Sequence, residues 1–90
     1  TVALYGAPAK ATTLLNFCGL RYVDLPYCWD TTEAKQHRHI PGTGIEIRAP
    51  WQGSRPDAFL LGAWNYARSI VKGNPGFEWI TPFPAPWVLP

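Results

Sequence analysis

The chain has 90 residues, 47% of them hydrophobic, and its eight basic and six acidic side chains leave a formal net charge of +2. This length suits one domain with one modest core, so we expect residues 1–90 to form a single domain. Like charges form no run and no apolar stretch approaches the ~20 residues of a membrane span, which argues against nucleic acid or a membrane as partner. No signal-peptide pattern is present, so we expect a cytoplasmic protein, and the start at Thr1 without a methionine suggests a piece of a longer chain.

The first part of the chain predicts a βαβ unit. Residues 2–5, VALY, form a continuous apolar run that ends at Gly6, as expected for a buried strand. Residues 9–18 carry apolar side chains at helical spacing, and Gly19 is a natural end for that helix. The chain then enters a second strand, predicted at 26–30, which completes strand, glycine turn, helix and strand.

The remaining elements continue the alternation. We predict a loop at 31–44, a short strand at 45–47, a buried strand at 58–64, a helix at 65–72 and a last strand at 77–83. The proline-rich end that follows, PAPWVLP, is not expected to continue the sheet. The fold class is therefore α/β, a small Rossmann-like three-layer sandwich whose mostly parallel sheet has four or five strands.

The turn after the first strand, YGAPAK, is the first candidate binding element. Backbone N–H groups at a helix N-terminus favour an anion, Gly6 allows its close approach, and Lys10 adds a positive charge. The turn lacks the other glycines of a dinucleotide loop, and Pro8 removes one N–H donor. A tight strand-to-helix turn without any ligand explains the same residues equally well.

Polar residues after the second strand form the next candidate. Asp30 stands roughly 20 residues past the glycine turn, where dinucleotide-binding βαβ units keep a ribose-binding carboxylate. Lys35, His37, Arg38 and His39 follow in one loop, which could hold a phosphate or sugar hydroxyls. The alternatives are a turn-forming aspartate and a solvated polar loop.

Trp64 and Asn65 close the third long strand, where they could stack on and hydrogen-bond a sugar or base. They could equally be a core aromatic and a helix cap. The predicted substrate-binding residues are thus Gly6, Lys10, Asp30, Lys35, Trp64 and Asn65.

We predict no catalytic and no metal-binding residue in this chain. No nucleophile–base pair or set of paired carboxylates is evident in the sequence. Cys18 and Cys28 are too few for a disulfide scaffold or a zinc tetrad, so we expect two buried free thiols.

Three segments also resemble, in order, blocks of one known family, the C-terminal domain of the sugar C-methyltransferases. They are YGAPAKATTLLNFCGL, DTTEAKQHRHIPGTGIEI and RPDAFLLGAWNYARSIV, and the resemblance runs from Val2 to about Pro84. It implies an N-terminal zinc domain, a central catalytic domain that binds S-adenosylmethionine, and a Rossmann-like C-terminal domain. The implied reaction is methyl transfer to the carbon beside the keto group of a dTDP-4-keto sugar, through an enolate.

The resemblance implies a supporting role for this domain. It contains no cofactor itself, while S-adenosylmethionine and zinc belong to the missing domains of a parent enzyme. Its partners are the methyltransferase core domain and the nucleotide-linked sugar, whose cleft it helps to form, and the isolated chain is expected to be inactive. The positions that match the family blocks are Gly6, Lys10, Asn16, Asp30, Lys35, Gln36, Pro41, Gly42, Trp64 and Asn65.

Two other functions remain open. The chain could be a free-standing Rossmann-like module that binds a nucleotide or a small anion. It could also be a purely structural interaction domain, with Trp51 and Trp87 as docking anchors.

Overall fold

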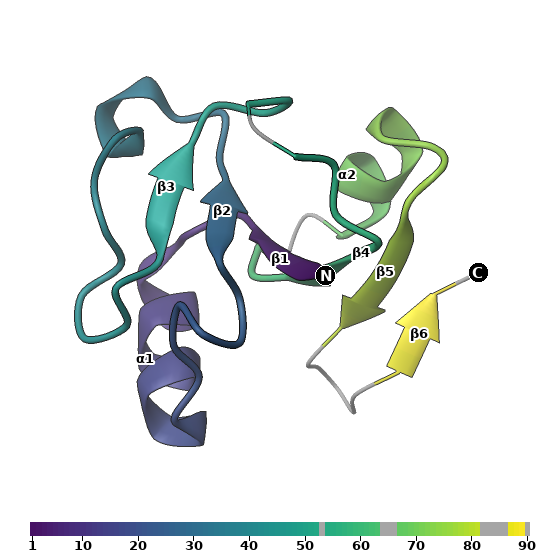
Figure 1. The fold of residues 1–90 in the computed structure, drawn as a ribbon. Coiled ribbons are helices and arrows are strands. Elements are labelled where there is room, and N and C mark those ends of the chain that lie inside the picture. Colours follow the sequence, from purple (N-terminus) through teal and green to yellow (C-terminus); the bar gives the residue numbers. More distant parts are fainter. Residues whose placement is uncertain (53, 64–66, 82–86, 90) are drawn as a thin grey trace.

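The strands form a single sheet in the computed structural model, which describes residues 1–52, 54–63, 67–81 and 87–89 (Figure 1). In chain order the elements are β1 (Val2–Tyr5), α1 (Ala9–Cys18), β2 (Tyr27–Trp29), the 3-10 turn η1 (Glu33–Lys35), β3 (Glu46–Arg48), β4 (Ala58–Leu61), α2 (Ala67–Gly73), β5 (Glu78–Thr81) and β6 (Trp87–Leu89). No helix in these ranges has the length and apolarity that crossing a membrane requires.

The sheet has the order β3-β2-β1-β4-β5-β6, and its first five members run parallel. In the central register Leu4 pairs with Cys28 on one side and with Leu60 on the other. Parallel neighbours need crossover connections: α1 lies in the crossover from β1 to β2, η1 in that from β2 to β3, and α2 in that from β4 to β5. The predicted α/β fold with a mostly parallel sheet is confirmed.

β6 corrects the expectation that the proline-rich end lies outside the sheet. This strand pairs antiparallel with β5, in the register Ile80 to Val88. The segment Trp87–Leu89 contains no proline, and as an edge strand it needs backbone hydrogen bonds on one side only.

Apolar side chains alternate between the two faces of the sheet. Leu4 and Cys28 belong to one buried cluster, which includes Leu15 of α1. Tyr5 and Trp29 belong to a second cluster. Because successive residues of a strand point to opposite faces, the two clusters lie on opposite sides of the sheet.

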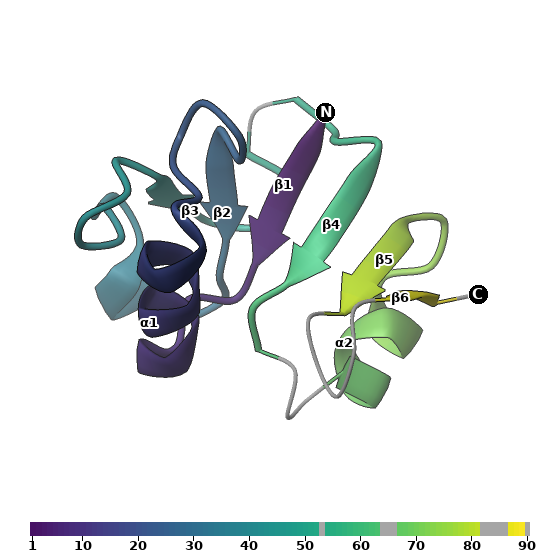
Figure 2. The same cartoon turned by 90° about the horizontal axis from the view of Figure 1, so that it is seen from below.

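The second face is covered differently from the first. Partly buried Ile70 and Val71 of α2 pack against the second cluster, which is rich in aromatic rings. Figure 1 and Figure 2 show α1 beside β2 and β3 at one end of the sheet and α2 beside β5 towards the other. The helices therefore cover opposite faces at opposite ends of the sheet, as a three-layer sandwich requires.

α1 begins and ends where the sequence predicts. Gly19 takes the left-handed conformation (φ 72°), and the N–H of Leu20 donates to the carbonyl of Leu15 at 2.9 Å. The expectation of two buried thiols is wrong for one of them: Cys28 is buried, but Cys18 is exposed. Cys18 lies in the last turn of α1, past Leu15, the last buried residue of the helix.

Other predicted boundaries shift by a few residues. The strands predicted at 26–30 and 58–64 are shorter, at Tyr27–Trp29 and Ala58–Leu61. The strand predicted at 77–83 begins at Glu78, and residues 82 and 83 lie outside the described part of the chain. The strand predicted at 45–47 moves by one residue, and the predicted loop at 31–44 contains η1. The described part of the predicted helix 65–72 begins at Ala67, and residues 64–66 lie outside the described residues.

Candidate functional site

A cavity of about 450 Å³ opens where several parallel strands end. Its lining comes from the segments that follow β1, β2 and β4, from η1 and from one side of α2. The lining residues are Tyr5, Gly6, Pro8, Asp30, Thr31, Thr32, Lys35, Ala63, Ser69, Ile70 and Asn74. Open α/β sheets bind ligands at this edge, and sites of about 300–1,000 Å³ hold small organic molecules.

Asp30, which lines this cavity, links the ends of β1 and β2. The side chain is buried, and its Oδ2 accepts a hydrogen bond from the N–H of Ala7 at 2.9 Å. Oδ1 accepts from the N–H of Thr32 at 2.8 Å, which closes the turn after β2. The carboxylate therefore already occupies an N–H group of the glycine turn that a phosphate would need.

Gly6 is required by packing. Its φ is +86°, and a Cβ at this position would lie 2.7 Å from the Cβ of Ala63. The end of β4 is equally close, because a Cβ on Gly62 would lie 2.1 Å from the carbonyl oxygen of Gly6. The N–H of Gly62 donates to the carbonyl of Tyr5 at 2.8 Å. The geometry favours the tight-turn interpretation of YGAPAK over the phosphate loop.

Lys35 supplies the positive charge of the cavity lining. It stands at the end of η1, and its Nζ donates a hydrogen bond to the carbonyl of Ala7 at 3.0 Å. An ammonium group has three N–H donors, so two remain for a ligand. Lys10, the other predicted lysine, is exposed on α1 and is not among the described residues that line the cavity.

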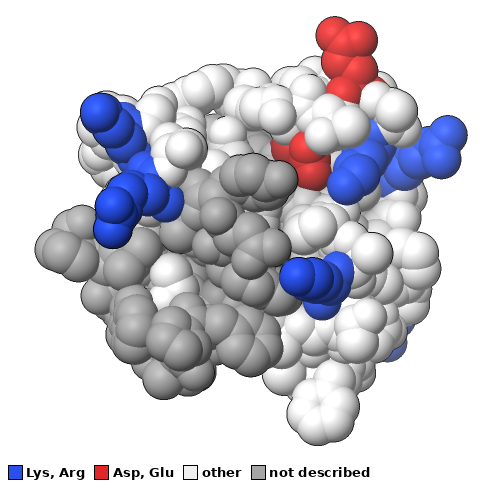
Figure 3. Space-filling model, turned by 180° about the vertical axis from the view of Figure 1, so that it is seen from behind, with Lys and Arg blue, Asp and Glu red and all other residues white. Residues whose placement is uncertain are grey.

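The predicted basic loop divides into two parts. Lys35 faces the cavity, whereas the following residues run along the outer edge of β3. The N–H of His37 donates to the carbonyl of Ile47 at 2.7 Å, and His39 forms an isolated antiparallel bridge with Glu46. On the face shown in Figure 3, the described Lys and Arg side chains stand in separate groups and do not cover one continuous surface.

Eight lining residues were not predicted as binding residues, and four of these carry a small polar side chain: Thr31, Thr32, Ser69 and Asn74. Thr31 and Thr32 directly follow Asp30, so their position at a strand end was an available signal. Ser69 and Asn74 come from α2 and its C-terminal turn, and their sequence carries no comparable signal.

Two predicted binding residues cannot be placed. Trp64 and Asn65 lie outside the described residues. Of the six predicted residues, the structure thus brings Gly6, Asp30 and Lys35 together in one cavity.

A second group of family-block residues joins α1 to the crossover between β2 and β3. The Nδ2 of Asn16 donates to the carbonyls of Thr12 (2.8 Å) and Pro41 (2.9 Å). A Cβ on Gly42, whose φ is +79°, would lie 2.2 Å from the Oδ1 of Asn16. The Nε2 of Gln36 donates to the carbonyl of Asp30 at 2.8 Å. These residues fix the position of the crossover and do not line the cavity.

Comparison with known proteins decides the family. The family described as "C-methyltransferase C-terminal domain" matches residues 1–84. The chain belongs to the C-methyltransferase C-terminal domain family. It is also 44% identical over 96 aligned residues to the C-methyltransferase NovU of Streptomyces niveus.

The extent of that match differs between the two proteins. It covers 99% of this chain but only 23% of NovU. The resemblance to a C-methyltransferase C-terminal domain is therefore confirmed, and β6 lies beyond the residues that the family matches. Most of the length of this relative has no counterpart in the 90 residues.

Proposed function

We propose that this domain helps to hold a nucleotide-linked deoxysugar in a C-methyltransferase whose chemical step takes place in other domains. Three observations support this function: the family, the 23% coverage of NovU, and the cavity at the carboxyl ends of the strands. The observation that carries it is Lys35, which brings an ammonium group to a cavity otherwise lined with hydroxyl, amide and apolar groups around one carboxylate.

The two charged side chains in the cavity, Asp30 and Lys35, determine how the ligand is oriented. Asp30 already accepts from the N–H of Ala7, so a diphosphate binds to the remaining N–H donors of Lys35 instead of to that backbone group. Thr31 and Thr32, whose side chains carry hydroxyl groups, also line this cavity. The amide of Asn74 donates from Nδ2 to the carbonyl of Ile70 at 2.8 Å, which leaves its Oδ1 to accept from a sugar hydroxyl.

The remaining parts of the enzyme are part of the same proposal. S-adenosylmethionine and zinc bind in other domains of a longer cytoplasmic polypeptide, and this domain packs beside the methyltransferase core. Within the described ranges, no three His, Cys, Asp or Glu side chains gather where they could hold a metal ion. We assign no catalytic residue to this domain.

NMR titration of the chain with dTDP, a dTDP-deoxysugar and S-adenosylmethionine tests the proposal. We expect amide shifts at Gly6, Asp30 and Lys35 with the nucleotide sugar and none with S-adenosylmethionine. Lys35→Ala should weaken binding at least about tenfold, because hydrogen bonds to charged groups contribute about 1.5–3 kcal/mol. The matched control is Lys10→Ala, which removes a lysine outside the cavity and should leave the affinity within about twofold.

Two outcomes would replace the proposal. Absence of shifts at saturating nucleotide sugar would favour a structural domain, an alternative already supported by the packing of Gly6 and by the internal bonds of Asp30. Equal affinity for inorganic diphosphate and for the dTDP-deoxysugar would favour a general anion-binding module.

A further inference from the structure

Three large apolar side chains project into solvent at the C-terminal end of α1. Phe17 is 89% exposed, Val23 73% and Tyr22 51%. They lie within seven consecutive residues, on the last turn of α1 and in the turn that follows it. We call this set of three residues the α1 patch. Isolated apolar side chains on a surface are normal, but a group of them indicates an interaction surface.

The backbone beneath the α1 patch is firmly held. The Oδ2 of Asp24 accepts from the N–H of Arg21 at 3.0 Å, and the N–H of Leu25 donates to the carbonyl of Arg21 at 3.0 Å. The N–H of Tyr22 donates to the carbonyl of Thr43 at 3.0 Å, which anchors the turn to the crossover loop. The apolar side chains therefore project from an ordered frame, and such preorganisation lowers the entropy cost of docking.

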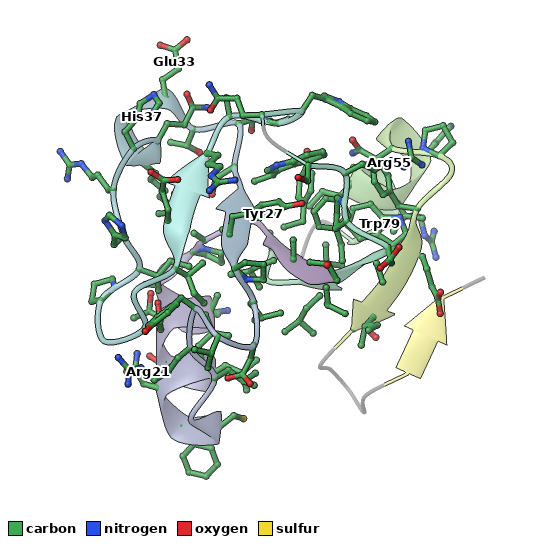
Figure 4. All side chains as sticks on the ribbon, viewed as in Figure 1. Arg21, Tyr27, Glu33, His37, Arg55 and Trp79 are labelled. Atoms are coloured by element: carbon green, nitrogen blue, oxygen red, sulfur yellow. The ribbon has the colours of Figure 1, made fainter. Side chains whose placement is uncertain are left out.

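The α1 patch is remote from the candidate site. α1 begins next to cavity-lining Pro8 and runs for 10 residues, or about 15 Å, before it reaches the patch. Figure 4 shows Arg21 at this end of the molecule, and Glu33 and His37 at the opposite end. A ligand in the cavity cannot cover the patch, so its occupant must be something else.

The size and charge of the patch indicate what covers it. Three side chains of this size expose on the order of 400 Å², well below the ~800 Å² per partner of a stable complex between separate chains. A surface this small suffices when both sides belong to one polypeptide, because the tether supplies a high effective concentration. Arg21 and Asp24 beside the patch carry opposite charges, so the surface does not select a charged partner.

We propose that the α1 patch packs against an apolar surface of another domain of the same polypeptide, on the side away from the cavity. The match to only 23% of NovU supports this occupant, because most of that relative lies outside the matched part. The inference depends on the family and not on the ligand of the cavity.

Cys18 provides a built-in probe, since this exposed thiol lies beside Phe17. We would compare its alkylation rate by iodoacetamide in the 90-residue chain and in the longer polypeptide, with peptide mapping by mass spectrometry. The proposal predicts a rate at least about tenfold lower in the longer polypeptide. An Arg38→Cys variant is the control, because this exposed position on the other side of the crossover loop should react equally in both.

The double variant F17S/V23S completes the test. It should restore the reactivity of Cys18 in the longer polypeptide while leaving the melting temperature of the 90-residue chain unchanged. Equal reactivity of Cys18 in both proteins would overturn the proposal, as would a reading frame that encodes no further domain. Protection of Cys18 that increases with protein concentration would identify a second copy as the occupant and overturn it too.

Discussion

Substituting Gly6 by alanine tests whether packing, and not ligand binding, requires a glycine at this position. The matched control is Gly19→Ala, because both glycines have a left-handed φ, +86° and +72°, but differ in their surroundings. A Cβ on Gly19 would meet nothing within 4 Å, whereas a Cβ on Gly6 would lie 2.7 Å from the Cβ of Ala63 and 3.1 Å from its backbone nitrogen.

The expected magnitudes follow from these distances. The left-handed conformation costs a non-glycine residue about 1–2 kcal/mol, and a less flexible unfolded chain offsets part of this, so Gly19→Ala should cost about 1 kcal/mol. Gly6→Ala carries the same conformational cost. It also overlaps two atoms that cannot rotate away, which adds about 1–3 kcal/mol for overpacking. We therefore expect Gly6→Ala to destabilise the fold by about 2–4 kcal/mol.

Urea unfolding followed by tryptophan fluorescence measures both free energies of unfolding. The double variant G6A/A63G should recover part of the loss, because it removes the contact between the two Cβ atoms but leaves the backbone nitrogen in place. Equal losses in Gly6→Ala and Gly19→Ala would refute the argument, since the close approach of Ala63 would then have no energetic consequence.

Three further predictions concern charged and reactive side chains. Asp30→Asn leaves one of two backbone N–H donors without its acceptor in a buried position, so urea unfolding should show a loss of about 1–3 kcal/mol; an unchanged midpoint would contradict the role of this carboxylate. Iodoacetamide should modify Cys18 in the folded chain but Cys28 only after unfolding, because burial, assisted by the charge of Asp30, raises the pKa of the Cys28 thiol; equal labelling of both would contradict this. The hydrogen bond from Arg48 lowers the pKa of Glu46 below its ordinary 4.5, so its contribution is complete above that pH and is lost as the pH falls further; Glu46→Gln should flatten the stability profile there, and an unaltered profile would contradict the ion pair.

The sequence was most informative where glycines interrupt apolar runs. Gly6 ends β1 and Gly19 ends α1, and both elements have the predicted bounds. The position of Asp30 at the end of β2 was also predictable, since a turn residue follows a buried run. Its hydrogen bond from Thr32 is local to the turn, but its bond from Ala7 was not predictable, because that bond depends on how β1 and β2 pair.

Other features depend on tertiary packing that local patterns do not encode. Part of the cavity lining comes from α2. Ile70 and Val71 of this helix pack against the aromatic-rich cluster, and this packing determines that Ser69 lines the cavity. Cys18 is exposed because α1 continues beyond its last buried residue. β6 was not predicted because prolines flank it on both sides, although the three residues of the strand include no proline.

The segment that contains His37 and Arg38 pairs with the outer edge of β3, and this pairing affects how the protein behaves in concentrated solution. Ile47, in the centre of this outermost strand, accepts from the N–H of His37 and donates to the carbonyl of Arg38, both at 2.7 Å. The backbone groups that an edge strand would otherwise offer to a neighbouring molecule are thus already paired within the chain. The exposed residues His37, Arg38 and His39 lie along the same border, and their polar side chains add to the protection of this side of the sheet against strand-by-strand aggregation.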